Sequence, residues 1–154
     1  MKTHHKGIHH ITSLAGDAQR NADFYVKGLG MRLVKKSVNQ DDPGTYHLFY
    51  GNADGDPGSG LTFFPWPMAV QGKPGVGEAV SVGLAVPSGA MEFWAVHLAE
   101  AGIDFEGPEE RYGKSVLRFK DPDLMQLELV FDEKVDALPA WSKGSIPEEY
   151  GIRG

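Results

Sequence analysis

Two adjacent histidines near the start of the chain, His9 and His10, are the residues whose type and setting best suit chemistry. They lie in an apolar, β-branched run, residues 8–14, that is typical of a strand. A neutral imidazole is a common ligand for Fe(II), Mn(II) and Zn(II), and two histidines with one carboxylate form the open site of non-heme Fe(II) oxygenases. The pair therefore predicts one corner of a metal site. The alternative is a buried or edge histidine that donates to a carbonyl.

Strand geometry separates the two histidines. Successive side chains of a strand point to opposite faces, so His9 and His10 cannot both ligate one metal ion. His10 shares its face with Thr12, whereas His9 shares the other face with Ile11. We expect at most one of the two histidines to be a ligand of a given metal.

Glu128 is the carboxylate best placed to join such a site. It lies in the alternating segment 125–131, in which the odd-numbered positions are apolar and Gln126 and Glu128 share the opposite face. On the concave side of a curved sheet, a carboxylate can bind a metal or act as a base. The alternatives are a solvated glutamate and one that pairs with Arg118 across a hairpin.

The remaining histidines are weaker candidates. His47 lies in a strand and is expected to be a packed or edge residue, although it could also line a pocket. His97 falls near the core-facing side of a helix, and His4 and His5 belong to a terminal segment that we expect to fray.

Composition limits the classes of function. The chain has 154 residues, 41% of them hydrophobic, and no cysteine, which excludes disulfides and thiolate ligands and fits a reducing cytoplasm. A net charge of −6 argues against nucleic acid or an anionic membrane as partner. No apolar run approaches the roughly 18 residues of a membrane span, and the basic start lacks the apolar stretch of a signal peptide.

The predicted elements occur twice in the same order: strand, helix, strand, strand, strand. In each half a dipeptide Asp-Pro, at residues 56–57 and 121–122, precedes the last strand. Asp17 is expected to cap the first helix and Ser88 the second, since their side-chain oxygens can accept orphan backbone N–H groups. The predicted strands are 8–14, 31–38, 45–51 and 60–64 in the first half, and 79–86, 103–106, 115–119 and 124–131 in the second.

This repeat predicts an α+β fold of two βαβββ modules with curved mixed sheets. The expected organisation is an N-terminal arm 1–6, a first module 7–66, a linker 67–77, a second module 78–133 and a C-terminal tail 134–154. The tail has no clear period and is expected to be too polar for the core, although Trp141 and Tyr150 should pack on something.

Several segments resemble the vicinal oxygen chelate superfamily, which includes glyoxalases, bleomycin resistance proteins and extradiol dioxygenases. Within it, the chain resembles the N-terminal half of hydroquinone ring-cleaving dioxygenases, over nearly its whole length. The segments that carry the resemblance are 8–12, 15–21, 23–25, 29–36, 42–48 and 61–66.

The resemblance implies an Fe(II) enzyme that opens a hydroquinone or catechol ring with O2, although Mn(II) or Zn(II) is possible. It implies that the metal is held by two histidines and one glutamate. His10 matches one of these ligands. His9 matches a residue that acts near the substrate as an acid, a base or a hydrogen-bonding group, and Thr12 matches a pocket position beside the metal.

The chain departs from the family pattern at the other ligands. Such enzymes usually have four modules, and their other two ligands come from the last one. Ser81 stands where the second module would carry a histidine, and Glu128 stands where a last-strand glutamate would lie. We therefore expect the chain to be an N-terminal half or a short form, with the missing corners supplied by further sequence or by a second subunit.

Three functions follow as hypotheses. The first is a ring-cleaving dioxygenase that takes a small aromatic diol and O2. The second is a metal-free module that binds a small aromatic molecule in the cup. The third is a glyoxalase-like isomerase or lyase in which His10 and Glu128 of the partner subunit share a metal. In every case we expect a homodimer, because an isolated half should expose an apolar surface.

Overall fold

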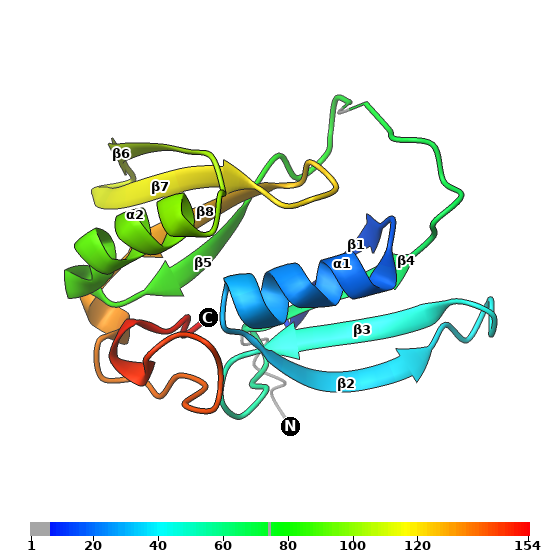
Figure 1. The fold of residues 1–154 in the computed structure, drawn as a ribbon, viewed down its shortest axis with the longest axis horizontal. Coiled ribbons are helices and arrows are strands. Elements are labelled where there is room, and N and C mark those ends of the chain that lie inside the picture. The colour runs from blue at the N-terminus through cyan, green and yellow to red at the C-terminus, as the bar shows by residue number, and fades with distance from the viewer. Residues whose placement is uncertain (1–6, 74) are drawn as a thin grey trace, which may run out of the picture.

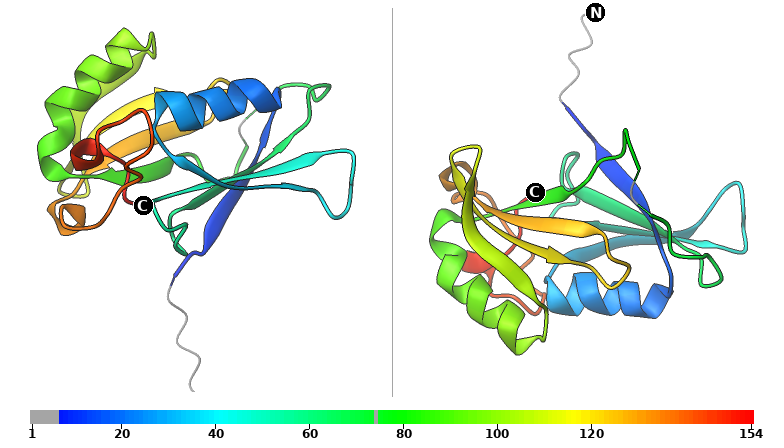
Figure 2. Two further views of the ribbon diagram at one scale, coloured as in Figure 1. Left: turned by 60° about the horizontal axis from the view of Figure 1, so that its bottom comes forward. Right: turned by 90° about the horizontal axis from the view of Figure 1, so that it is seen from above.

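The computed structural model describes residues 7–73 and 75–154, so the N-terminal arm, with His4 and His5, lies outside the described residues. Two four-stranded mixed sheets lie side by side, each with its own helix, which confirms the α+β fold of two βαβββ units (Figure 1). Both views in Figure 2 show α1 and α2 toward the same side of the sheets. None of the helices in the described ranges is long and apolar enough to cross a membrane.

The first sheet has the strand order β1-β4-β3-β2. β1 runs parallel to β4, whereas β3 is antiparallel to both β4 and β2. Because of the parallel pair, the first strand of the unit lies beside its last strand. Its elements are β1 (His10–Ala15), α1 (Ala18–Ala22) with a π-helical continuation (Asp23–Gly28), β2 (Arg32–Val38), β3 (Tyr46–Gly51) and β4 (Gly60–Pro65).

The second sheet repeats this topology in the order β5-β8-β7-β6, with β5 parallel to β8. β6 is longer than the predicted strand 103–106, because its pairing with β7 continues as far as Arg111 opposite Lys114. Its elements are β5 (Val82–Val86), a 3-10 turn (Ser88–Ala90), α2 (Met91–Glu100), β6 (Phe105–Arg111), β7 (Lys114–Lys120) and β8 (Gln126–Phe131).

The two predicted helix caps have different outcomes. Asp17 caps α1 as predicted, because its Oδ1 accepts from the backbone N–H of Arg20 at 2.7 Å. The prediction for Ser88 is wrong: the 3-10 turn separates it from α2, which begins at Met91 without a side-chain cap. Ser88 instead donates from its hydroxyl to Asp136 Oδ2 at 2.9 Å, and so ties the start of the turn to the tail.

The core lies between the helices and the sheets, and a buried polar bond crosses it. The hydroxyl of Tyr25, which is fully buried, donates to Asp121 Oδ2 at 3.0 Å. Asp121 Oδ1 accepts from the backbone N–H groups of Asp123 and Met125, at 2.9 and 2.8 Å. Burial raises the pKa of Asp121 and also that of Tyr25. The bond therefore ties the first helical segment to the turn between β7 and β8.

The tail is part of the core, contrary to the expectation from its polarity. Ile146 and Ile152 are both buried, and Ser145 Oγ donates to the carbonyl of Lys27 at 2.5 Å. Tyr150 stacks on Phe93 of α2, with ring centroids 4.4 Å apart, so the expectation that Tyr150 packs is confirmed. The tail thus contacts both units, as the orange-to-red segment of Figure 1 shows. Its few apolar residues are spaced by turns and not by a helix or strand period, which is why no pattern revealed them.

Candidate functional site

One face of the first sheet points away from the core. The candidate residues His10, Thr12 and His47 lie on this face. Along β1 the exposure alternates, with Ile11 and Ser13 partly buried and His10 and Thr12 exposed. The register places Thr12 beside Thr62 of β4, and Phe49 of β3 on the other side of Thr62. We call this surface the histidine face, and its residues are His10, Thr12, His47, Phe49, Thr62 and Phe64.

His9 does not lie on the opposite face from His10, because β1 begins at His10 and strand alternation does not extend to His9. The two rings meet edge-on with centroids 5.2 Å apart, and their Nδ1 atoms are 3.0 Å apart. One of these nitrogens carries the shared proton. If His10 donates it, its Nε2 is a free lone pair directed away from His9. A histidine that ligates a metal usually donates its second ring N–H to a carboxylate, a backbone carbonyl or water, and His9 Nδ1 would be the acceptor here.

Gly60 makes room for His10 at the start of the parallel pair. It is the register partner of His10, and a Cβ built on Gly60 would lie 2.9 Å from the His10 Cβ. The neighbouring Gly58 N–H donates to the His9 carbonyl at 2.7 Å. The segment 58–60, where β4 begins, therefore fixes the backbone of both histidines. Any side chain at residue 60 must displace His10.

A chain of hydrogen bonds crosses the histidine face from β1 to β3. Thr12 Oγ1 lies 2.9 Å from Thr62 Oγ1, which lies 3.1 Å from His47 Nε2. The His47 ring packs against Phe49 and Phe64, with centroid distances of 3.9 and 4.1 Å. His47 is therefore packed, as expected, but it also reaches the exposed Thr12. The sequence signal for this was the alternation of residues 45–51, which puts His47 and Phe49 on one face.

The surroundings of His47 favour its neutral form. Burial lowers the pKa of His47, and the nearby charges of His10 and Lys35 act in the same direction. A neutral imidazole has one donor and one acceptor nitrogen. His47 can therefore accept from Thr62 or donate to it, but a single tautomer does only one of the two.

Glu128 lies on β8 of the second sheet and is engaged in an ion pair. Its side chain is 10% exposed and its Oε1 accepts from Arg111 Nη1. The expected alternative partner, Arg118, is its register neighbour but contacts Glu106 and Glu109 of β6, at 2.7 and 2.9 Å. The Arg111 side chain reaches Glu128 from β6, so the carboxylate already has a cation.

The described residues do not complete a three-ligand metal site. Within residues 7–73 and 75–154, no group of three or more His, Cys, Asp or Glu side chains is arranged to hold a metal ion. Ser81, at the position expected to carry a second histidine, offers only a hydroxyl. Of the donor set that iron would need, this part of the chain supplies the His10 imidazole, and it keeps the Glu128 carboxylate in an ion pair.

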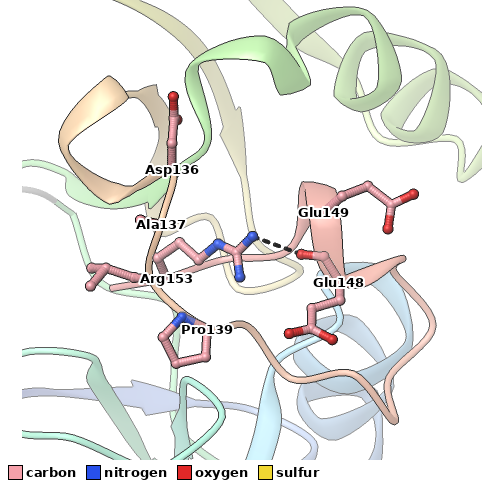
Figure 3. Close-up of a pocket in the computed structure, with 7 residues that line it drawn as sticks. Asp136, Ala137, Pro139, Glu148, Glu149 and Arg153 are labelled. Carbon is pink, nitrogen blue, oxygen red and sulfur yellow. Dashed lines mark hydrogen bonds between the residues drawn. The ribbon is translucent and has the colours of Figure 1, made fainter.

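A polar pocket lies at the tail (Figure 3). Arg153 is 6% exposed there, and its Nη2 donates to the Glu148 carbonyl at 2.9 Å. Burial lowers the pKa of Arg153, and the nearby Glu148 and Asp136 carboxylates oppose that shift. None of the residues that line this pocket belongs to the histidine face.

Comparison with known proteins agrees with this geometry. A family model described as the Glyoxalase/Bleomycin resistance protein/Dioxygenase superfamily matches residues 7–129. The chain is 45% identical over 148 residues to the "Putative ring-cleaving dioxygenase MhqO" of Bacillus subtilis (strain 168), covering 96% of this chain and 47% of that protein. It is 36% identical over 152 residues to the "Chlorohydroquinone/hydroquinone 1,2-dioxygenase" of Sphingobium indicum, covering 97% of this chain and 47% of that protein.

A solved crystal structure has the same fold as this chain. A crystal structure described as a putative dioxygenase from Bacillus subtilis subsp. subtilis str. 168 superposes with a TM-score of 0.89 at 44% identity, over 96% of this chain and 47% of that one. The chain spans about half the length of the curated relatives it matches. With a matching family model over most of its length and two sheets of the expected topology, the chain belongs to the glyoxalase/bleomycin resistance protein/dioxygenase superfamily.

Proposed function

We propose that the chain forms one part of a ring-cleaving dioxygenase site that acts on a hydroquinone or catechol with O2. The observation that carries the proposal is the His10 imidazole, exposed on the histidine face and bonded through Nδ1 to His9 at 3.0 Å. The names of the relatives support the reaction class, since both describe ring cleavage or a hydroquinone dioxygenase. The proposed metal is Fe(II), with Mn(II) or Zn(II) as alternatives.

Each residue of the face has a proposed task. His10 would be a metal ligand through Nε2, and bound iron would supply a template and charge stabilisation for the two reacting oxygens. His9 would hold the His10 ring by accepting, at its own Nδ1, the proton that His10 carries on Nδ1. The Thr12 hydroxyl, exposed two residues along β1, would bind a ring hydroxyl of the substrate. The rings of Phe49 and Phe64 would keep water from the edge of the site.

Glu128 remains a predicted metal ligand that requires a rearrangement. To bind a metal in its own chain, or to meet His10 of the partner subunit in a glyoxalase-like site, its carboxylate must first leave Arg111. Breaking an ion pair with little solvent exposure is costly unless a metal replaces the lost cation. The alternative is that the pair is structural and that the metal takes its other ligands from outside this chain.

The metal-free binding module is the second candidate function. It is favoured by the finding that the described residues hold no cluster of three or more metal-ligating side chains. The aromatic rings around His47 and the hydroxyls beside them suit a small phenolic ligand equally well with or without a metal.

Iron loading and oxygen uptake test the first proposal against the second. The purified chain is incubated with Fe(II) without oxygen, its iron content is measured, and hydroquinone and O2 are then added. If a second subunit supplies the missing ligands, the chain binds iron and takes up O2, and both are lost in His10→Ala and kept in His97→Gln, a control histidine of α2 that contacts the Gly28 carbonyl. Absence of iron and uptake refutes catalysis by this chain, and calorimetric binding of hydroquinone under the same conditions then favours the binding module.

The assembly is tested separately. Apolar side chains such as Leu14 and Ile8 of the first unit are exposed, at 52% and 72%. Such surfaces often meet a partner, so we expect a homodimer in light scattering of the purified chain. A monomer at all concentrations contradicts this expectation.

A further inference from the structure

We propose that His47 is a positioning residue that acts through Thr62 to fix the hydrogen-bonding direction of the Thr12 hydroxyl. The inference rests on the proposed function, because it assigns Thr12 to a ring hydroxyl of a phenolic substrate. It adds two residues, His47 and Thr62, to the residues that determine how such a ring is held.

The three side chains form one continuous path. Thr12 Oγ1, Thr62 Oγ1 and His47 Nε2 are joined by distances of 2.9 and 3.1 Å, although Thr12 and Thr62 are fifty residues apart in sequence. Thr62 is 1% exposed, so water does not compete for its hydroxyl. A buried hydroxyl normally keeps its hydrogen-bond partners, because leaving it without them costs free energy.

The middle hydroxyl couples the two ends of the path. A threonine hydroxyl has one proton, so Thr62 can donate to only one neighbour and must accept from the other. If His47 Nε2 lacks a proton, Thr62 donates to it and accepts from Thr12, whose oxygen then offers only lone pairs to a ligand. If Nε2 is protonated, Thr62 donates to Thr12, whose proton is then free for a ligand.

His47 is held firmly enough to impose this choice. Its ring packs against both Phe49 and Phe64, and Lys35 lies over the Phe49 ring at 5.7 Å. Contact with these two aromatic rings restricts rotation of the imidazole, so the Nε2 atom stays directed at Thr62. The outer end of the path, Thr12, is exposed on the same strand and the same face as His10. A ligand hydroxyl there would meet a partner whose hydrogen-bonding direction is set by His47 through the buried Thr62 hydroxyl.

Three variants distinguish an effect of the hydrogen bonds between Thr12, Thr62 and His47 from an effect of side-chain packing. Thr62→Val removes the hydroxyl at nearly constant shape, and Thr62→Ser restores it. His47→Phe keeps a ring against Phe49 and Phe64 but removes the nitrogen. Circular dichroism establishes that each variant folds, and the serine and phenylalanine variants keep the test informative if the valine variant does not.

The first measurement is spectroscopic and needs no ligand. In 15N NMR of the wild-type chain, we expect His47 to show one hydrogen-bonded tautomer. We expect its Nε2 shift to move in Thr62→Val and to return in Thr62→Ser. An unchanged Nε2 shift in the folded Thr62→Val variant overturns the inference.

The second measurement is the affinity of the same chains for hydroquinone, by calorimetry. Loss of one hydrogen bond predicts binding about fivefold weaker in Thr62→Val and His47→Phe, and near wild-type binding in Thr62→Ser. The Thr12→Val/Thr62→Val double variant should bind no more weakly than Thr12→Val, since both changes break one path. Equal binding by wild type and Thr62→Val overturns the inference and leaves the proposed function standing, whereas no binding by wild type contradicts both.

Discussion

Replacing Gly60 by alanine tests directly how closely β4 approaches His10. The added Cβ would lie 2.9 Å from the His10 Cβ and 3.4 Å from the His9 carbonyl oxygen. Ordinary contact begins at 3.4 Å, so the two strands must separate by at least 3.4 − 2.9 = 0.5 Å at this point. The conformation of Gly60 is otherwise open to any residue, and the effect is therefore one of space alone.

The expected cost follows from overpacking. Extra volume at a closely packed position typically costs about 1–3 kcal/mol of the free energy of unfolding. Since a displacement of about 1 Å at a reacting group can cost about a hundredfold in rate, half that shift predicts about tenfold weaker function in any assay that depends on His10.

Urea denaturation measures the free energy of unfolding, and the iron and hydroquinone assays measure the effect on the face. Gly72→Ala is the matched control, because a Cβ on Gly72 meets nothing within 4 Å. It should change stability by less than about 0.5 kcal/mol. If Gly60→Ala is as stable as Gly72→Ala and binds as wild type does, then the close approach of β4 to His10 is refuted.

Three further predictions concern the framework. Tyr25→Phe leaves the buried Asp121 Oδ2 without its donor, so urea denaturation should show a loss of about 1–3 kcal/mol; no loss would contradict the bond. Because burial raises the pKa of Asp121, the unfolded state binds fewer protons between the ordinary pKa of an aspartate, about 4, and the raised value. The free energy of unfolding of the wild type should therefore fall as pH rises through that window, and this contribution should be absent in Asp121→Asn. If the free energy of unfolding has the same pH dependence in both chains, the raised pKa of Asp121 is refuted. Ile146→Ala should cost about 2–5 kcal/mol in thermal or urea unfolding, because Ile146 is buried; a change below about 0.5 kcal/mol would mean that the tail does not join the core.

Local chemistry was enough to predict the repeated elements and the shared face of His10 and Thr12. A cap such as Asp17 and an alternating strand such as β1 depend on residues within one turn or one strand, so the sequence reveals them directly. The same alternation predicted that His10 and Thr12 share a face, and the exposures along β1 agree. It failed at His9, because periodicity has no meaning one residue outside the strand.

Partners from distant segments were decided only by the tertiary structure. The path from Thr12 through Thr62 to His47 needs the parallel pairing of β1 with β4 and the antiparallel register of β3. Glu128 pairs with Arg111, whereas Arg118 pairs with Glu106 and Glu109 of β6. The sequence does not reveal these partners, because they depend on how far long side chains reach across neighbouring strands. The sequence by itself thus determined the order of the repeated strands and helices, the Asp17 cap, and that His10 shares a face with Thr12. Only the fold decided what each polar atom bonds to, since those partners lie far along the chain and meet through sheet register and packing.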